Sequence, residues 1–487
     1  MKKLISSFRK AMFPFFSFPP FVLRKIFSTR SKIELIEMRE WIYASREILE
    51  RINTSSKLAK YRKKSEDGVL FSSKELAKVS KYGYKAQEVI ANNTYLNGGG
   101  YRVSSRFAIE KFLAYESNCA FRQLNSNNLI FFGPEWASSI GHSTNLSILP
   151  KLESVNPGLS ERVLIYSHAA NHFYLSLLAK HYTLCRIPEN LKSILVTYLN
   201  DCLHPLDAMR TSPTEVLDIY SAMTVAEQLW ARSSNSRNFL ELPEAALERG
   251  NSFLQTTLLA SYEWFVVLHM REASTTKARG AGNVEINSYI PAIKEILAAG
   301  GAVVRIGNSG MTRLGTFDQG LESNPAYFDY ANSSFKSEEL DIFLMSNCRF
   351  MIGTASGPIF IPKEFGKSVL YTNAPNVGVL PGILGFALPN LYQDTSGRLL
   401  SLSEMLGFDE VGWKMSRVRE RFIRLPNSGE DIRLATQFMI SEGCHTTHDS
   451  NSDSLNLLVS KTRNLHRLTS AMPICPTYLS THDELLR

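Results

Sequence analysis

Short apolar runs alternate with amphipathic stretches along most of the chain, and this alternation predicts a parallel α/β architecture. Buried strands are predicted at 128–133, 162–167, 266–270, 302–306, 350–353 and 368–371. Helices are predicted at 145–151, 212–232, 243–259, 289–299, 359–365, 432–442 and 454–468. Continuous apolar runs of this length are typical of strands that are buried on both faces, and strands that alternate with helices pair in parallel.

The front of the chain has a different pattern, without strand-like runs. Amphipathic helices are predicted at 33–51, 73–91 and 105–115, and no repeat is evident. The chain is therefore expected to divide into an N-terminal arm (1–32), a helical segment (33–125), a first Rossmann-like lobe (126–260), a second Rossmann-like lobe (261–428) and a helical tail (429–487).

Composition supports a globular protein with more than one core. The chain has 487 residues, of which 44% are hydrophobic and 21% charged, and this length favours two lobes with added segments. Its cysteines show no CxxC or Cys/His metal spacing, which indicates thiols in a reducing compartment. They are Cys119, Cys185, Cys202, Cys348, Cys444 and Cys475. His168 and His172 lie four residues apart but lack a third ligand, so no metal site is expected.

The net charge of +8 favours anionic partners, and its distribution separates the candidates. Eight lysines and arginines precede the first acid, Glu34, and they flank an aromatic, proline-broken run at 12–23. That run is too short to span a bilayer, and its prolines argue against a signal peptide. Residues 1–32 are therefore predicted to contact an anionic membrane surface. The alternatives are a disordered basic tail and an arm packed on its own domain.

Charged residues follow the predicted strand at 266–270. Arg271 lies at its carboxyl end, where open α/β sheets place ligand contacts, and its guanidinium is a candidate for binding phosphate. The alternative is a structural ion pair with Glu272. Glu272 is a candidate general base, or else a carboxylate that orients the arginine. His269 is either a ligand contact or a core imidazole. Arg305, which ends the next strand, is a candidate contact for phosphate or ribose, with a surface salt bridge as the alternative.

A turn of small residues follows the predicted strand at 350–353. Gly353 and Gly357 permit close backbone approach, while the hydroxyls of Thr354 and Ser356 add hydrogen-bond donors. Such a turn before a helix is a candidate phosphate cradle. The alternative is a tight strand-to-helix turn without a ligand. No nucleic-acid-binding module is evident, so no nucleic-acid partner is expected.

Several motifs in this order resemble a family of bacterial glycosyltransferases found with surface-polysaccharide genes. They are Leu268-His269-Met270-Arg271-Glu272, Asn283, 301–307, Asp329-Tyr330-Ala331, Asp341-Ile342-Phe343-Leu344, 348–357, Pro476-Thr477-Tyr478-Leu479 and Leu485-Leu486. The His-x-Arg element and the layout are in turn similar to the GT-B fucosyltransferases. The helical residues 1–125 lie mostly outside the resemblance.

The resemblance implies a GT-B-like fold with two Rossmann-like lobes facing a cleft. It implies metal-independent transfer of a sugar from a nucleotide-sugar donor to a glycan or lipid-linked acceptor, without a cofactor. Hexosyl or fucosyl transfer, a GDP-sugar and inversion follow from the fucosyltransferase similarity. The expected location is the cytoplasm, peripheral on the inner face of the cytoplasmic membrane. The alternative function is a non-catalytic, membrane-associated carbohydrate-binding or assembly factor with the same fold.

The resemblance also assigns roles to residues. Ser139-Ile140-Gly141-His142 looks like the glycine-histidine turn at the cleft of GT-B enzymes, so His142 is implied as general base or sugar ligand. The alternative is an exposed histidine at a helix N-terminus. His142 and Glu272 are then the candidate catalytic residues. The candidate donor-binding residues are His269, Arg271, Arg305, Gly353, Thr354, Ser356 and Gly357.

Overall fold

The chain folds into two compact units, each described here by itself. The first comprises Met1–His142, Asn156–Ala170 and Ala179–Ile219, and the second Ser143–Val155, Asn171–Leu178 and Tyr220–Arg487. The structure is a computed structural model. It describes residues 111–119, 129–154, 161–190, 192, 202–212, 215–233, 238–272, 284–375, 383–406, 421–441, 472–482 and 485. The predictions for 1–32, for most of 33–125 and for 454–468 lie outside the described residues; within 33–125, residues 111–119 are helical.

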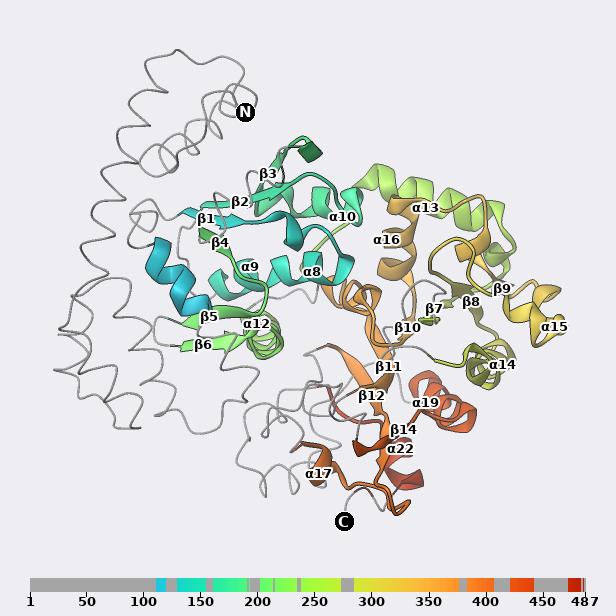
Figure 1. The fold of residues 1–487 in the computed structure, drawn as a ribbon. Helices are drawn as coiled ribbons and strands as arrows, with labels where there is room; N and C mark the ends of the chain where they lie inside the picture. The colour runs from blue at the N-terminus through green and yellow to red at the C-terminus, as the bar shows by residue number, and fades with distance from the viewer. Residues whose placement is uncertain are drawn as a thin grey trace, which may run out of the picture. The chain divides into compact units, whose positions relative to one another are not determined.

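The first unit contains a parallel four-stranded sheet in the order β3-β2-β1-β4 (Figure 1). Its strands are β1 (Leu129–Phe132), β2 (Glu161–Tyr166), β3 (Thr183–Arg186) and β4 (Leu203–His204). Phe132 is fully buried and stacks on the ring of His204, with 4.9 Å between ring centroids. The ring of Trp136 also makes a T-shaped contact with His204, so aromatic packing fixes the carboxyl ends of β1 and β4 against each other.

The prediction of one helix over 212–232 is wrong in its first part. Two antiparallel strands, β5 (Ala208–Ser212) and β6 (Glu215–Asp218), precede helix α12 (Ile219–Ser233). Val216 of β6 packs in a small core with Ala208 of β5 and with Phe112. Because this contact joins residues about a hundred positions apart, local periodicity does not reveal it.

The second unit contains a six-stranded, all-parallel sheet in the order β12-β11-β10-β7-β8-β9. Its strands are β7 (Phe265–His269), β8 (Ala302–Arg305), β9 (Tyr327–Phe328), β10 (Phe350–Gly353), β11 (Ser368–Ala374) and β12 (Gly385–Pro389). Numbered along the chain, this is the 3-2-1-4-5-6 order of a doubly wound Rossmann sheet. Both faces are covered, which explains why the strands are continuous apolar runs.

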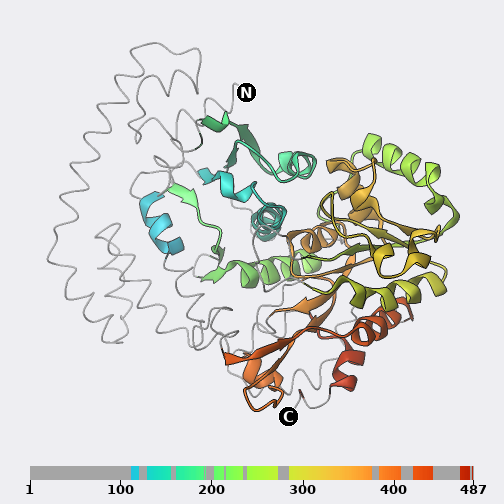
Figure 2. The ribbon, with the colours of Figure 1, turned by 45° about the vertical axis from the view of Figure 1, so that its right-hand side comes forward.

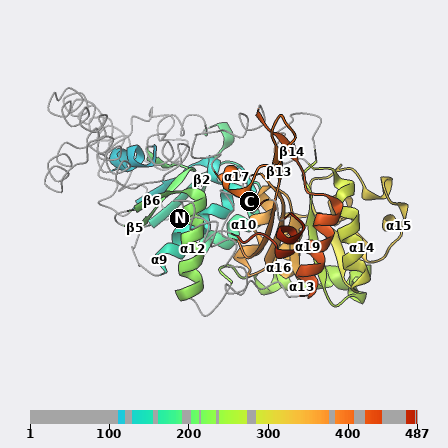
Figure 3. The same ribbon diagram turned by 90° about the horizontal axis from the view of Figure 1, so that it is seen from below.

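Helices cover the two faces of this sheet. Helix α14 (Ile290–Ala298) connects β7 to β8, and α16 (Glu338–Asn347) connects β9 to β10 in the opposite direction. Right-handed crossovers therefore place them on opposite faces. Helix α19 (Gly429–Ser441) lies beside α14 in Figures 1, 2 and 3, and α13 (Glu244–Thr256) packs against α16.

The remaining elements are short. They are the helices α8 (Ile140–Thr144), α9 (Ile148–Glu153), α10 (His172–Leu177), α15 (Gln319–Glu322), α17 (Leu402–Leu406) and α22 (Pro476–Thr481), and the antiparallel strands β13 (Leu391–Gln393) and β14 (Ile423–Leu425). Among the residues that the structure describes, no helix combines the length and the apolarity needed to cross a bilayer.

A buried cluster of two lysines and two glutamates holds α9 in the second unit. Lys151 Nζ lies 2.9 Å from Glu364 Oε2 and 2.6 Å from Glu227 Oε1, and Lys363 Nζ contacts the same two carboxylates at 2.5 and 2.6 Å. Burial alone would raise the pKa of Glu364, but the two ammonium groups more than offset it and lower that pKa. Each buried charge is thus compensated by an opposite one.

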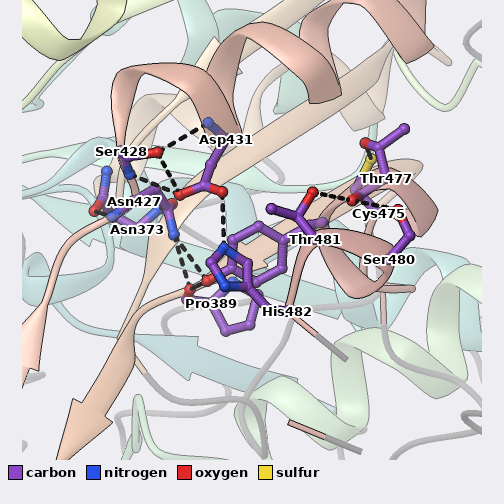
Figure 4. Close-up of polar contacts among 11 residues, drawn as sticks. Asn373, Pro389, Asn427, Ser428, Asp431, Cys475, Thr477, Ser480, Thr481 and His482 are labelled. Carbon is purple, nitrogen blue, oxygen red and sulfur yellow. Dashed lines mark hydrogen bonds and ion pairs between the residues drawn. The ribbon is translucent and has the colours of Figure 1, made fainter. Parts of the chain in front are cut away.

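The C-terminal segment docks on the start of α19 (Figure 4). Ser428 and Asp431 form a reciprocal cap: the Ser428 hydroxyl donates to Asp431 Oδ2 (2.7 Å), and the Asp431 amide donates to Ser428 Oγ (3.0 Å). His482, just after α22, contacts the other carboxylate oxygen of Asp431 at 2.8 Å. This arrangement confirms the predicted helix at 432–442 and shows what fixes its start.

The predicted α/β class with two Rossmann-like parallel sheets is confirmed. The four-stranded sheet lies within 126–260 and the six-stranded sheet within 261–428, while residues 220–260 belong to the second compact unit. The cleft between the lobes stays a prediction.

Candidate functional site

The candidate site lies at the switch point of the six-stranded sheet. Strands β7 and β10 are neighbours there, and the chain winds away from them in opposite directions. Their ends are level, because Gly353 pairs with His269. In open parallel sheets, ligands bind outside the carboxyl ends of the strands at such a point. The topology therefore brings together two segments that the sequence singled out separately, 269–272 and 353–357.

Three hydrogen bonds tie the end of β7 to the turn at 353–357, and two of them come from Arg271. The amide of Arg271 donates to Thr354 Oγ1 (3.1 Å), and the amide of Thr354 donates to the carbonyl of His269 (3.2 Å). The guanidinium donates through Nη1 to the carbonyl of Ala355 at 3.3 Å, its one hydrogen bond among the described residues. A guanidinium has five N–H donors, so a half-buried Arg271 keeps donors for an anion beside the turn.

The turn itself differs from the prediction in one respect. The expected helical run at 359–365 consists of two 3-10 turns, Gly357–Phe360 and Pro362–Glu364, and not of one α-helix. Pro358 and Pro362 interrupt the run of backbone donors. A long helix dipole is therefore absent here, and the phosphate hypothesis depends on the hydroxyls of Thr354 and Ser356 and on Arg271. A side chain at Gly353 would place its Cβ 2.5 Å from Ile359, so this glycine is required for packing.

His269 is buried and faces the same turn. Its pKa is lowered to about 4, mainly by burial and also by the positive charges of Arg305, Arg271 and Lys336. Its Nδ1 lies 3.3 Å from Ser356 Oγ. The imidazole is therefore neutral at pH 7 and serves as a hydrogen-bond partner of the turn. The sequence did not single out Lys336, whose ammonium lies 3.0 Å from Asp341.

Arg305 and Glu272 form an ion pair that the sequence did not predict. Arg305 is fully buried, its Nη2 donates to Glu272 Oε1, and its Nη1 donates to the carbonyl of Thr312 at 2.5 Å. The amide of Thr312 donates to Glu272 Oε2 (3.0 Å), and Asp329 lies 3.6 Å from Arg305. The expected alternatives were a pair of Glu272 with Arg271 and a surface salt bridge for Arg305. Instead, Glu272 is engaged with Arg305 on the side of β8.

His142 occupies the corresponding region of the first unit. It lies in α8, soon after the carboxyl end of β1, where the order of the four-stranded sheet also reverses. Its Nδ1 is 3.0 Å from the carbonyl oxygen of Glu135, and its amide donates to Ser139 Oγ (3.2 Å). A carbonyl only accepts, so Nδ1 carries the proton and Nε2 of the neutral ring holds a lone pair. This tautomer is competent as a general base.

Metal ligands are not gathered in the part of the chain that the structure describes, where no group of three His, Cys, Asp or Glu side chains is placed to hold an ion. Five of the cysteines are described, and all are free thiols, as the sequence predicted for them.

Comparison with known proteins gives only distant similarities. No protein-family model and no curated protein matches the chain. Among solved structures, a glycosyl transferase family 9 protein from Veillonella parvula is 12% identical, with 65% of this chain and 97% of that chain covered and a TM-score of 0.40. The ADP-heptose LPS heptosyltransferase II of E. coli is 10% identical, with coverages of 50% and 83% and a TM-score of 0.34. The E. coli heptosyltransferase WaaC with ADP is 12% identical, with coverages of 60% and 96% and a TM-score of 0.31.

Proposed function

We propose that the protein is a glycosyltransferase that binds the diphosphate of a nucleotide sugar at the switch point of its six-stranded sheet. One observation carries this proposal: the guanidinium of Arg271 lies over the turn at 353–357, bonded to the carbonyl of Ala355. A cation beside Thr354 and Ser356, at the carboxyl ends of two parallel strands, suits a phosphate ligand. The motif resemblance supports the same function.

In the proposed reaction, an acceptor hydroxyl attacks the anomeric carbon of the donor sugar. The new glycosidic C–O bond forms as the bond to the diphosphate breaks, and the nucleoside diphosphate leaves with the electron pair. The acceptor proton passes to a general base. Arg271 offsets the negative charge that develops on the leaving diphosphate, so the proposed transfer needs no metal ion.

The contacts favour His142 over Glu272 as that base. His142 has the tautomer with an available Nε2, whereas both carboxylate oxygens of Glu272 already accept hydrogen bonds, from Arg305 and from the Thr312 amide. Arg305 then acts on the donor site indirectly, by fixing Glu272 and the loop at 312. His269, neutral and bonded to Ser356, orients the turn.

The finer parts of the proposal rest on the sequence. They are a glycan or lipid-linked acceptor in bacterial surface polysaccharide synthesis, hexosyl or fucosyl transfer without a cofactor, and contact of residues 1–32 with an anionic membrane surface in the cytoplasm. The basic and aromatic composition of 1–32 supports the last of these.

A nucleotide-sugar screen tests the donor site. Wild-type protein, Arg271→Ala and Arg398→Ala are mixed with GDP-, UDP-, CMP- and dTDP-sugars, and the melting temperature and donor hydrolysis are measured. Arg398 is the charge-matched control, because it is 57% exposed and pairs with Asp394 and Glu404. We expect one nucleotide class to stabilise the wild type and the control, with binding at least about tenfold weaker in Arg271→Ala.

Two results would count against the proposal. If no donor binds the folded wild type, the donor site is wrong. If a donor binds but is neither hydrolysed nor transferred to any acceptor extract, the non-catalytic carbohydrate-binding or assembly role takes its place.

A further inference from the structure

A series of buried hydrogen bonds connects Asn427, just before α19, to the turn at 353–357. Thr372, next to β10 on strand β11, donates through its hydroxyl to the carbonyl of Gly353 at 3.1 Å. The hydroxyl of Tyr289 lies 2.6 Å from Thr372 Oγ1, and the side-chain amide of Asn373 donates to the Tyr289 oxygen at 3.1 Å. All three side chains are essentially fully buried.

The carbonyl of Gly353, at the end of this series, determines which group donates in each hydrogen bond. The carbonyl of Gly353 can only accept, so the Thr372 proton points to it and Thr372 Oγ1 accepts from Tyr289. The Tyr289 oxygen in turn accepts from the Asn373 amide. Hydrogen bonds aligned in one direction in a buried environment strengthen one another, and breaking one leaves a buried polar group without its partner.

The far end of this series of hydrogen bonds is anchored by Asn427, just before α19, and by Tyr478, on α22. Asn373 and Asn427 form a reciprocal pair: each backbone amide donates to the other's side-chain oxygen, at 2.5 and 2.9 Å. Asn427 donates to the carbonyl of Pro389 (2.8 Å), and the hydroxyl of Tyr478, on α22, donates to the same carbonyl (2.8 Å). Figure 4 shows the Asn373–Asn427 contact beside Pro389.

Asn373 has the backbone conformation of a position under constraint. Its φ is +53°, the one non-glycine residue of the described chain with a positive φ. An asparagine tolerates this conformation better than most residues, although it still costs free energy. The strand thus bends where its side chain must reach Tyr289 on one side and Asn427 on the other.

We infer that Thr372 and Tyr289 are positioning residues for the turn at 353–357, and that Asn427, just before α19, and Tyr478, on α22, hold them in place. The turn is then fixed from two sides, by His269 and Arg271 of the β7 end and by Thr372 of β11. The functional part of this inference rests on the proposed function, because positioning matters only if the turn binds the donor diphosphate.

The test compares Thr372→Val with two matched variants. Thr372→Ser keeps the hydroxyl. Thr436→Val makes the same change at another fully buried threonine, whose hydroxyl donates to the carbonyl of Ile432 within α19 (2.7 Å). Hydrogen–deuterium exchange of peptides covering 350–358 is measured without nucleotide. Kd for GDP and UDP, donor KM and acceptor KM are measured in parallel.

We expect Thr372→Val to speed exchange at the turn and to raise the Kd and the donor KM about tenfold, with acceptor KM unchanged. Thr372→Ser and Thr436→Val should stay near the wild type in all four. Tyr289→Phe provides a second test if Thr372→Val does not fold, because it removes the donor to Thr372 and leaves the bond to Gly353. It should speed exchange at the turn by a smaller factor.

The exchange and binding measurements together show whether the inference or the proposed function fails. If neither GDP nor UDP binds the wild type but exchange at the turn responds to Thr372→Val and not to Thr436→Val, the positioning stands and the diphosphate role fails. If Thr372→Val and Thr436→Val change the turn equally, or if the turn loosens while nucleotide affinity is unaffected, the inference is overturned.

Discussion

The fully buried guanidinium of Arg305 is paired with the carboxylate of Glu272, although Glu272 follows Arg271 directly in the sequence. Arg305 ends β8 and Glu272 lies just beyond β7, so the pair joins neighbouring strands at the carboxyl edge of the sheet. Arg271 is thereby left without Glu272 as its partner, and its guanidinium turns to the carbonyl of Ala355. Because Glu272 pairs with Arg305, the guanidinium of Arg271 has no carboxylate partner among the described residues and can bind an anion.

Glu272→Ala is expected to destabilise the protein by about 3 kcal/mol, because among the described residues it leaves the buried guanidinium with Asp329 and the carbonyl of Thr312 as its partners. Urea unfolding measures this loss. The control is Glu322→Ala, whose partner Arg313 is exposed, and it should cost less than about 1 kcal/mol. If Glu272→Ala is as stable as the control yet abolishes transfer, Glu272 is the base and its structural role here is wrong.

His142→Gln is expected to lower kcat about 10²- to 10⁴-fold while donor affinity stays within twofold of the wild type, because a general base acts on the acceptor proton and not on the diphosphate. Initial rates and donor titration on the same preparation provide the two numbers. His181→Gln, at a half-buried histidine of the first unit, controls for the substitution itself. A kcat unchanged in His142→Gln would remove His142 from the mechanism.

The stability of the second unit should fall on acidification because of His269. Its pKa is lowered from 6.5 to about 4, so between these values the unfolded chain binds a proton that the folded chain does not. Stability contributed by the neutral ring is present above pH 6.5 and is lost as the pH falls towards 4. At pH 5 this loss is about 2 kcal/mol.

The contribution of His269 to this loss is measured by comparing the free energy of unfolding of the wild type and of His269→Gln at pH 7 and at pH 5. The difference between the two pH values should be about 2 kcal/mol smaller in His269→Gln, since glutamine does not titrate. An equal pH dependence in both proteins would show that His269 is not held neutral. His204, whose pKa burial also lowers to about 4, remains in both proteins and cancels in the comparison.

Glu364→Gln is expected to destabilise the protein by about 3–5 kcal/mol, because Lys151 and Lys363 would then share one carboxylate in a buried cluster. Chemical unfolding provides the measurement. Glu404→Gln, whose partner Arg398 is exposed, is the control with an effect below about 1 kcal/mol. A small effect of Glu364→Gln would mean that water or a rearranged side chain replaces the lost charge.

Local patterns determined much of this protein from the sequence. The runs at 266–270, 302–306 and 350–353 predicted three buried strands, because a strand buried on both faces needs consecutive apolar residues. They also placed Arg271 and Arg305 at strand ends. The strand-helix alternation was sufficient for the α/β class. These features depend on residues that are close together in the chain, so a short window of sequence contains them.

Tertiary structure decided which of these residues meet. The strand order puts β7 beside β10, and only then do Arg271 and the 353–357 turn share one edge of the sheet. The same packing pairs Glu272 with Arg305 and connects Tyr289, Thr372 and Asn373 by hydrogen bonds. The start of the predicted helix at 212–232 forms a hairpin instead. The Glu272–Arg305 pair and the contacts of Tyr289 with Thr372 and Asn373 join residues that are distant in sequence, and the hairpin packs on Phe112, about a hundred positions away. Their stability comes from burial in the complete fold, which no local periodicity encodes.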